Sequence, residues 1–230
     1  MTEITDHLAQ VRKRIANAAS AAGRDAADVT LLAVSKTQPV AAIQTAYAAG
    51  QRDFGESFVQ EAIPKIDALG HSDICWHFIG HVQSNKTRDI AHHFDWVHTI
   101  DRLKIAQRLN DQRPHYAKPL AACIQVNLAE EPQKGGVQAT DLVPLARAVA
   151  ELPRLSLRGL MTIPPANASD AAIAELFDEL RDWLARLNGE GLDLDTLSMG
   201  MSADLEIAIA HGATIVRIGT AVFGPRQRNA

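Results

Sequence analysis

Two apolar stretches near opposite ends of the chain finish in residues that could do chemistry. The stretch 31–37 ends with Lys36, and the stretch 213–220 carries Arg217 and ends in a Gly-Thr corner. A lysine that emerges from a buried strand into a closed mouth is desolvated, which favours the neutral amine that attacks aldehydes. We therefore expect Lys36 to form an imine with a phosphorylated aldehyde whose ring and phosphate the second stretch holds. The alternative is a lysine at a strand end that reaches solvent.

Glycines in the last part of the chain predict a phosphate site. The two places are Gly200 to Ser202 and the pair Gly219 and Thr220. Glycine lets backbone N–H groups approach an anion, and the N-terminus of a following helix adds partial positive charge. In the alternative interpretation Ser202 is only a helix N-cap, and the glycines are turns.

Arg217 is unusual because it lies inside an apolar strand. A guanidinium in that place must be paired or must bind a ligand. The sequence is compatible with an ion pair to Glu56 or another carboxylate at a strand end. It is equally compatible with a ligand contact.

The nine histidines show no convincing metal-ligand spacing, since His77 and His81 straddle a strand end. We therefore expect no metal site.

The elements that must position these residues alternate between strand and helix. An amphipathic helix is predicted over 2–22, where apolar residues repeat at helical spacing. Strands are predicted at 31–35, 52–56, 75–79, 96–100, 120–126, 155–163, 196–199 and 213–218. Helices are predicted between them at 39–49, 57–68, 84–93, 102–111, 139–151, 170–188 and 202–211.

This alternation predicts one α/β domain over 1–230, a (β/α)8 TIM barrel with an extra N-terminal helix. Near-continuous apolar strands are typical of a parallel sheet covered on both faces. A doubly wound open sheet is the alternative, although no Gly-x-Gly-x-x-Gly follows the first strand. In a barrel the carboxyl ends of the strands meet at one mouth. The residues expected there are Lys36, Glu56, His81, Asn127, Met199, Ser202, Gly219 and Thr220.

Composition restricts the class of protein. The chain is 47% hydrophobic and 22% charged, and its net charge of −4 without clustered basic residues argues against nucleic-acid binding. No signal peptide and no membrane span are expected. Cys75 and Cys123 fall in predicted strands as free thiols, which fits a cytoplasmic location. We expect a monomer because no exposed apolar stripe stands out.

Six motifs resemble the pyridoxal phosphate homeostasis family, which is similar to the barrel domain of alanine racemase. They are 32–36 (LAVSK), 53–56 (DFGE), 76–80 with 83–86 (WHFIG and QSNK), 157–161 (LRGLM), 198–204 (SMGMSAD) and 216–220 (VRIGT). The resemblance runs from about residue 30 to 224 and follows most strand ends in order. One departure is Ser57, where the family usually has Asn.

The resemblance implies pyridoxal 5′-phosphate (PLP) as the ligand and Lys36 as the Schiff-base lysine. It implies that Arg217 faces the pyridine nitrogen and that Met199 lies near the ring. It also implies that Ser202, Gly219 and Thr220 hold the phosphate.

The residue at the ring nitrogen bears on catalysis. A carboxylate keeps that nitrogen protonated and strengthens the ring as an electron sink, whereas arginine stays cationic and only donates a hydrogen bond. The alanine racemases also supply a second base from an added domain, which we do not expect here. Neither Tyr47 nor Tyr116, the two tyrosines, is predicted at the mouth.

We expect a PLP carrier or buffer in PLP homeostasis, not an enzyme, with PLP-dependent apoenzymes as candidate partners. The alternatives are a weak PLP-dependent racemase or lyase and a class I aldolase.

Overall fold

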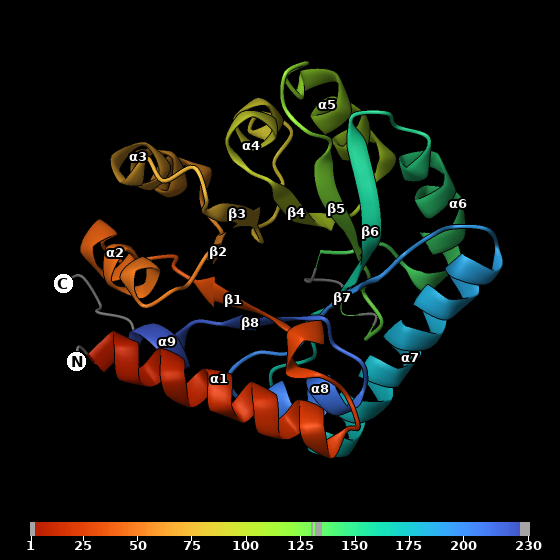
Figure 1. The fold of residues 1–230 in the computed structure, drawn as a ribbon. Helices are drawn as coiled ribbons and strands as arrows, with labels where there is room; N and C mark the ends of the chain where they lie inside the picture. The colour runs from red at the N-terminus through yellow and green to blue at the C-terminus, as the bar shows by residue number, and fades with distance from the viewer. Residues whose placement is uncertain (1–2, 130, 132–134, 226–230) are drawn as a thin grey trace.

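Eight parallel strands form a closed barrel in the computed structural model of the chain, which describes residues 3–129, 131 and 135–225 (Figure 1). The strands are β1 (Thr30–Val34), β2 (Asp53–Glu56), β3 (Cys75–Phe78), β4 (Trp96–Ile100), β5 (Leu120–Gln125), β6 (Leu155–Met161), β7 (Thr196–Ser198) and β8 (Ile215–Ile218). They pair in chain order, and β8 returns to pair with β1. The predicted TIM barrel is therefore confirmed, and the doubly wound open sheet is wrong.

Helices surround the barrel. They are α1 (Glu3–Ala21), α2 (Val40–Ala48), α3 (Val59–Leu69), α4 (Thr87–His93), α5 (Leu103–Gln112), α6 (Ala139–Ala150), α7 (Asp170–Gly189), α8 (Leu205–Ala210) and α9 (Thr220–Phe223), with a 3-10 turn η1 (Ala26–Asp28). Each follows a strand except α1 and η1, which precede β1. In the described part of the chain, no helix has both the length and the apolar character that crossing a membrane requires.

The extra N-terminal helix packs beside the end of the chain. Its buried residues Leu8, Val11, Ile15 and Ala19 recur at the helical spacing that the sequence shows. They face α8, α9 and α2, and Figure 1 shows α1 in red lying along α8 and α9. The helix thus covers the closure of the barrel, where β1 and β8 meet.

The closure brings the two chemically interesting stretches together. In the parallel register of β1 and β8, Leu32 lies opposite Arg217 and Ala33 lies opposite Ile218. Lys36 leaves the end of β1, and Gly219 leaves the end of β8. Residues that are about 180 positions apart in sequence are therefore neighbours at one barrel end.

Two predicted helix starts are wrong. The helix predicted from Ser84 begins at Thr87, whose hydroxyl donates to the Ser84 carbonyl at 3.0 Å. The helix predicted from Ser202 begins at Leu205 with Asp204 before it, and the Asp204 carboxylate accepts from the Met201 N–H at 2.6 Å. Ser202 is therefore not the N-cap. The turns η1 and α9 were not predicted, because a single turn is too short for periodicity to show.

Gly200 connects β7 to α8 in a conformation that suits only glycine. Its φ is 89°, and a Cβ placed there would overlap the Cβ of Ala208. We expect Gly200→Ala to lower the free energy of unfolding by about 3 kcal/mol, because it combines a left-handed backbone with overpacking. Urea unfolding measures the loss. Gly189→Ala is the matched control: it sits at the end of α7 with no atom near its added Cβ, and should change stability little.

Candidate functional site

A cavity of about 300 Å³ opens at the carboxyl ends of the strands. The side chains and backbone that offer polar groups to it are Lys36, Ser57, Ser202, Arg217, Gly219 and Thr220. Its apolar wall includes Ile79, Met161, Ile163 and Met201. An amine, a guanidinium, hydroxyls and glycine backbone therefore meet in one space large enough for a small ligand.

Not every residue expected at the mouth reaches the cavity. Met199 is fully buried in the core, and Met201, which is 40% exposed, lines the cavity two residues later. His81 is exposed near Asp101, and the Asn127 amide is bonded to the backbone of Glu131 instead. Neither His81 nor Asn127 lines the cavity.

Sequence reasoning missed the apolar wall. Ile79 and Ile163 continue the inward-facing alternation of β3 and β6 just beyond the strand ends, two residues after His77 and Met161. The period-two rule of a strand could have placed both in the mouth. Ser57, singled out only as a departure from the family pattern, also lines the cavity.

The turn that carries Lys36 is unusual. Thr37 has a φ of 65°, and it is the only non-glycine residue with a positive φ in the part of the chain that the structure describes. Its N–H donates to Glu61 Oε1 at 2.5 Å. A β-branched residue in this region costs on the order of 1–3 kcal/mol, so neighbouring contacts must hold the turn in place.

A buried cluster beneath the turn provides those contacts. Lys65 Nζ donates to Glu56 Oε1 at 2.9 Å, to the Ser35 carbonyl at 2.9 Å and to Glu61 Oε1 at 2.5 Å. The Ser35 hydroxyl also donates to Glu56 Oε1, at 2.6 Å. Burial raises the pKa of Glu56, and Lys65 opposes that rise. Glu56 therefore helps to hold the Lys36 turn and lies outside the cavity.

Arg217 is held by neutral partners. Its Nη1 donates to Ser198 Oγ at 2.9 Å and its Nη2 to the Thr162 carbonyl at 2.8 Å. Among the described residues no carboxylate forms an ion pair with it, so the predicted alternative of a pair with Glu56 is wrong. Desolvation lowers the pKa of Arg217 to about 10, which leaves it cationic at neutral pH. A buried positive charge that forms no ion pair with a carboxylate of the described residues favours a ligand contact.

Behind Arg217, a line of hydrogen bonds runs through the barrel interior. Ser198 Oγ lies 2.8 Å from His98 Nδ1, and His98 Nε2 lies 3.0 Å from His77 Nδ1. His77 Nε2 lies 3.2 Å from Asp53 Oδ1, at the start of β2. Burial is the main cause that lowers the pKa of His98 well below its usual range, followed by the charges of His77 and Arg217. Arg217 is thus connected to the opposite barrel end.

Comparison with known proteins identifies the family. The family model described as "Alanine racemase, N-terminal domain" matches residues 7–227. The pyridoxal phosphate homeostasis protein of Pseudomonas aeruginosa is 57% identical over 230 residues, which cover 100% of this chain and 99% of that protein. The chain belongs to the pyridoxal phosphate homeostasis family. Another family member, from Escherichia coli, is 53% identical over 99% of this chain and 98% of its own length.

Solved structures support the same family assignment. The PipY protein of Synechococcus elongatus is 40% identical, and each comparison covers 96% of this chain and 100% of PipY. The TM-score is 0.88 for PipY without PLP and 0.86 for PipY with PLP bound. The family resemblance expected from the six motifs is therefore confirmed, and the barrel of this family member matches a solved PLP-binding protein.

Proposed function

We propose that this chain binds PLP in the cavity, with Lys36 as the amine that forms the Schiff base, and that it acts in PLP homeostasis as a carrier or buffer. The observation that carries the proposal is the meeting of Lys36 with Arg217, a buried cation without a carboxylate partner among the described residues. The names of the curated relatives and the PLP-bound structure of PipY support the choice of ligand.

The donor groups in the cavity fit the parts of this cofactor. When bound, PLP supplies an aldehyde carbon, an electron-accepting ring and a phosphate dianion. We assign Ser202, Gly219 and Thr220 to the phosphate, because hydroxyls and glycine backbone donate hydrogen bonds to anions without steric hindrance. Arg217 faces the ring nitrogen in this proposal. We assign the apolar contact with the ring to Met201, since Met199 is buried away from the cavity.

The same residues favour a carrier over a catalyst. Arg217 is fixed by Ser198 and Thr162 and remains cationic, so it donates a hydrogen bond to the ring nitrogen and does not protonate it. The ring is then a weaker electron sink. Neither tyrosine lines the cavity: Tyr47 donates to Asp73 at 2.8 Å, and Tyr116 is 91% exposed. A weak racemase or lyase is therefore the less favoured function.

Two measurements on the purified full chain test this proposal. Borohydride reduction of the PLP-loaded protein, followed by peptide mass analysis, should place one pyridoxyl group on Lys36. Incubation of the loaded protein with amino acids should give no sustained racemisation or elimination. A label on another lysine would contradict the site, and enzyme-like turnover would contradict the carrier role while leaving the site intact.

A further inference from the structure

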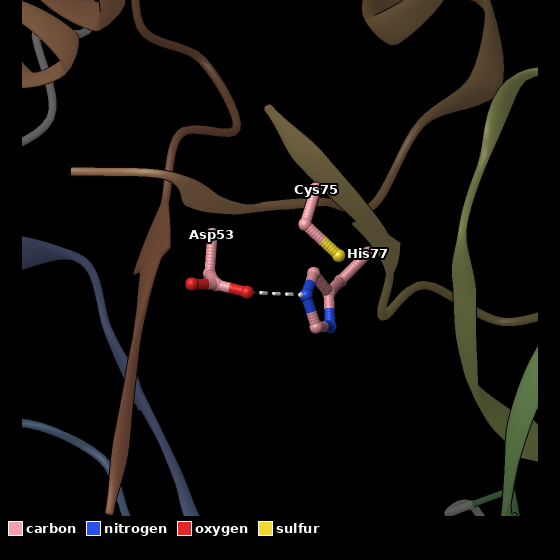
Figure 2. Close-up of side chains that lie close together, drawn as sticks. All are labelled: Asp53, Cys75 and His77. Atoms are coloured by element: carbon pink, nitrogen blue, oxygen red, sulfur yellow. Dashed lines mark hydrogen bonds and ion pairs between the residues drawn. The ribbon is translucent and has the colours of Figure 1, made fainter. Parts of the chain in front are cut away.

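A second cluster of chemically active side chains lies at the end of the barrel opposite Lys36. Asp53 and Cys75 begin β2 and β3 and lie opposite each other in the strand register. His77 comes two residues after Cys75, so it faces the same side of β3. A carboxylate oxygen, the sulfur and a ring nitrogen of these residues all lie within 4.8 Å of one another. Figure 2 shows the three side chains together, with a dashed line for the contact between Asp53 and His77.

The three side chains form a coherent ligand set. Imidazole nitrogen, sulfur and carboxylate oxygen are the ligands that Zn²⁺ takes in proteins, and three protein ligands leave a fourth position for water or another ligand. Asp53 also lines a cavity of about 400 Å³ between α1 and the strand starts. Asp53 is the one of the three residues that lines this cavity.

His77 is held in the orientation that a metal ligand requires. It is buried, and its ring stacks on Trp96 at a centroid distance of 5.4 Å and an interplanar angle of 9°. Its Nδ1 lies 3.0 Å from His98 Nε2, which leaves Nε2 directed at Asp53. Ligating histidines in proteins are commonly fixed in this way, by a hydrogen bond at the nitrogen that does not bind the metal.

We propose that Asp53, Cys75 and His77 bind a divalent transition-metal cation of the Zn²⁺ class through Oδ1, Sγ and Nε2. Coordination releases the thiol proton of Cys75 to solvent, and His77 binds as a neutral ring whose single N–H proton moves from Nε2 to Nδ1. The proposal departs from the expectation that the chain holds no metal. Histidine spacing could not reveal the site, because Asp53 is 22 residues from Cys75 and meets it only through strand pairing.

Cobalt(II) tests the proposal on the full chain, because its spectrum reports the ligands. Titration should show one Co²⁺ bound per chain, with a thiolate-to-metal charge-transfer band in the near ultraviolet. Cys75→Ser should abolish that band. Cys123→Ser is the matched control, since Cys123 is the other free thiol and is buried elsewhere in the barrel. It should retain the band.

Asp53→Asn is a second test of the site, which still applies if Cys75→Ser fails to fold. The Asp53 side chain is 32% exposed, so the amide should be tolerated, while loss of the carboxylate should weaken Co²⁺ binding at least about tenfold. Circular dichroism and thermal unfolding check that each variant is folded. A folded wild-type chain without the thiolate band would overturn the proposal. So would a band that survives Cys75→Ser, or unchanged affinity in folded Asp53→Asn.

Discussion

Lys36→Ala should abolish the visible absorption that the PLP-loaded chain shows, and borohydride should then fix no pyridoxyl group. The expected loss is complete, because the amine is the only part of the proposed site that can bond to the aldehyde carbon. The cavity itself should survive: the turn is held by Ser35, Glu61 and Lys65, not by the Lys36 side chain alone. Absorption spectra and intact-protein mass before and after reduction measure the effect.

Lys104→Ala is the matched control for this substitution. Lys104 lies exposed on α5, away from the cavity, and its replacement should leave both the spectrum and the reduced mass unchanged. A Lys36→Ala chain that still acquires one reducible pyridoxyl group would refute Lys36 as the Schiff-base residue. If the spectrum disappeared in both variants, the absorption would not report a specific site.

Lys65→Met should produce the largest loss of stability. The Lys65 side chain is 7% exposed and its partner Glu56 is fully buried, with one carboxylate oxygen, Oε2, that has no hydrogen-bond partner in the structure. Methionine preserves most of the side-chain volume but leaves that charge uncompensated. Removing one partner of a buried pair typically costs about 3–5 kcal/mol. Urea unfolding of the variant and of the wild-type chain measures the difference in the free energy of unfolding.

The loss should depend on pH with a defined sign. Burial already raises the pKa of Glu56 above its ordinary value of 4.5, and removal of Lys65 removes the main charge that opposes this rise. The folded state therefore holds a proton that the unfolded chain gives up first as the pH increases. Stability of Lys65→Met should fall from mildly acidic to mildly alkaline pH, and the gap to wild type should widen.

A double variant separates charge from packing. Glu56→Gln combined with Lys65→Met removes both charges and should recover most of the lost stability and flatten the pH dependence. If the double variant is as unstable as Lys65→Met at every pH, the uncompensated carboxylate is not the cause.

The rate of PLP loading is a second measurement for Lys65→Met, since Lys65 donates to the Ser35 carbonyl beside Lys36. Slower PLP loading in Lys65→Met would show that the buried cluster positions the amine.

The barrel could be predicted because its evidence is local. Runs such as Leu31 to Val34 and Ile215 to Ile218 are apolar and lie between helical patterns, so their order alone indicated eight strand–helix units. Closure then made Lys36 and Arg217 neighbours. The starts of α4 and α8 could not be predicted, because Ser84 and Ser202 are residue types that suit an N-cap but also suit a loop.

The surroundings of the site could not be predicted, because they depend on contacts between elements. Lys65 lies on α3 directly after Pro64, and nothing local shows that its amine reaches a buried carboxylate on β2. Met199 and Met201 are both plausible neighbours of a ligand by sequence, and only the backbone course after β7 separates a buried from an exposed side chain. The cluster of Asp53, Cys75 and His77 likewise depends on strand register.

The line of hydrogen bonds behind Arg217 has a defined proton order. Asp53 accepts, so His77 carries its proton on Nε2 and accepts at Nδ1 from His98. With both rings neutral, His98 accepts at Nδ1 from the Ser198 hydroxyl, which in turn accepts from Arg217. All donors therefore point from the barrel end that carries Lys36 towards Asp53. A cation bound at His77 Nε2 would shift the proton of each histidine to Nδ1, so that His98 would donate to Ser198 and the Ser198 hydroxyl could donate elsewhere. The direction of the hydrogen bonds beside Arg217 therefore depends on what binds at the opposite barrel end.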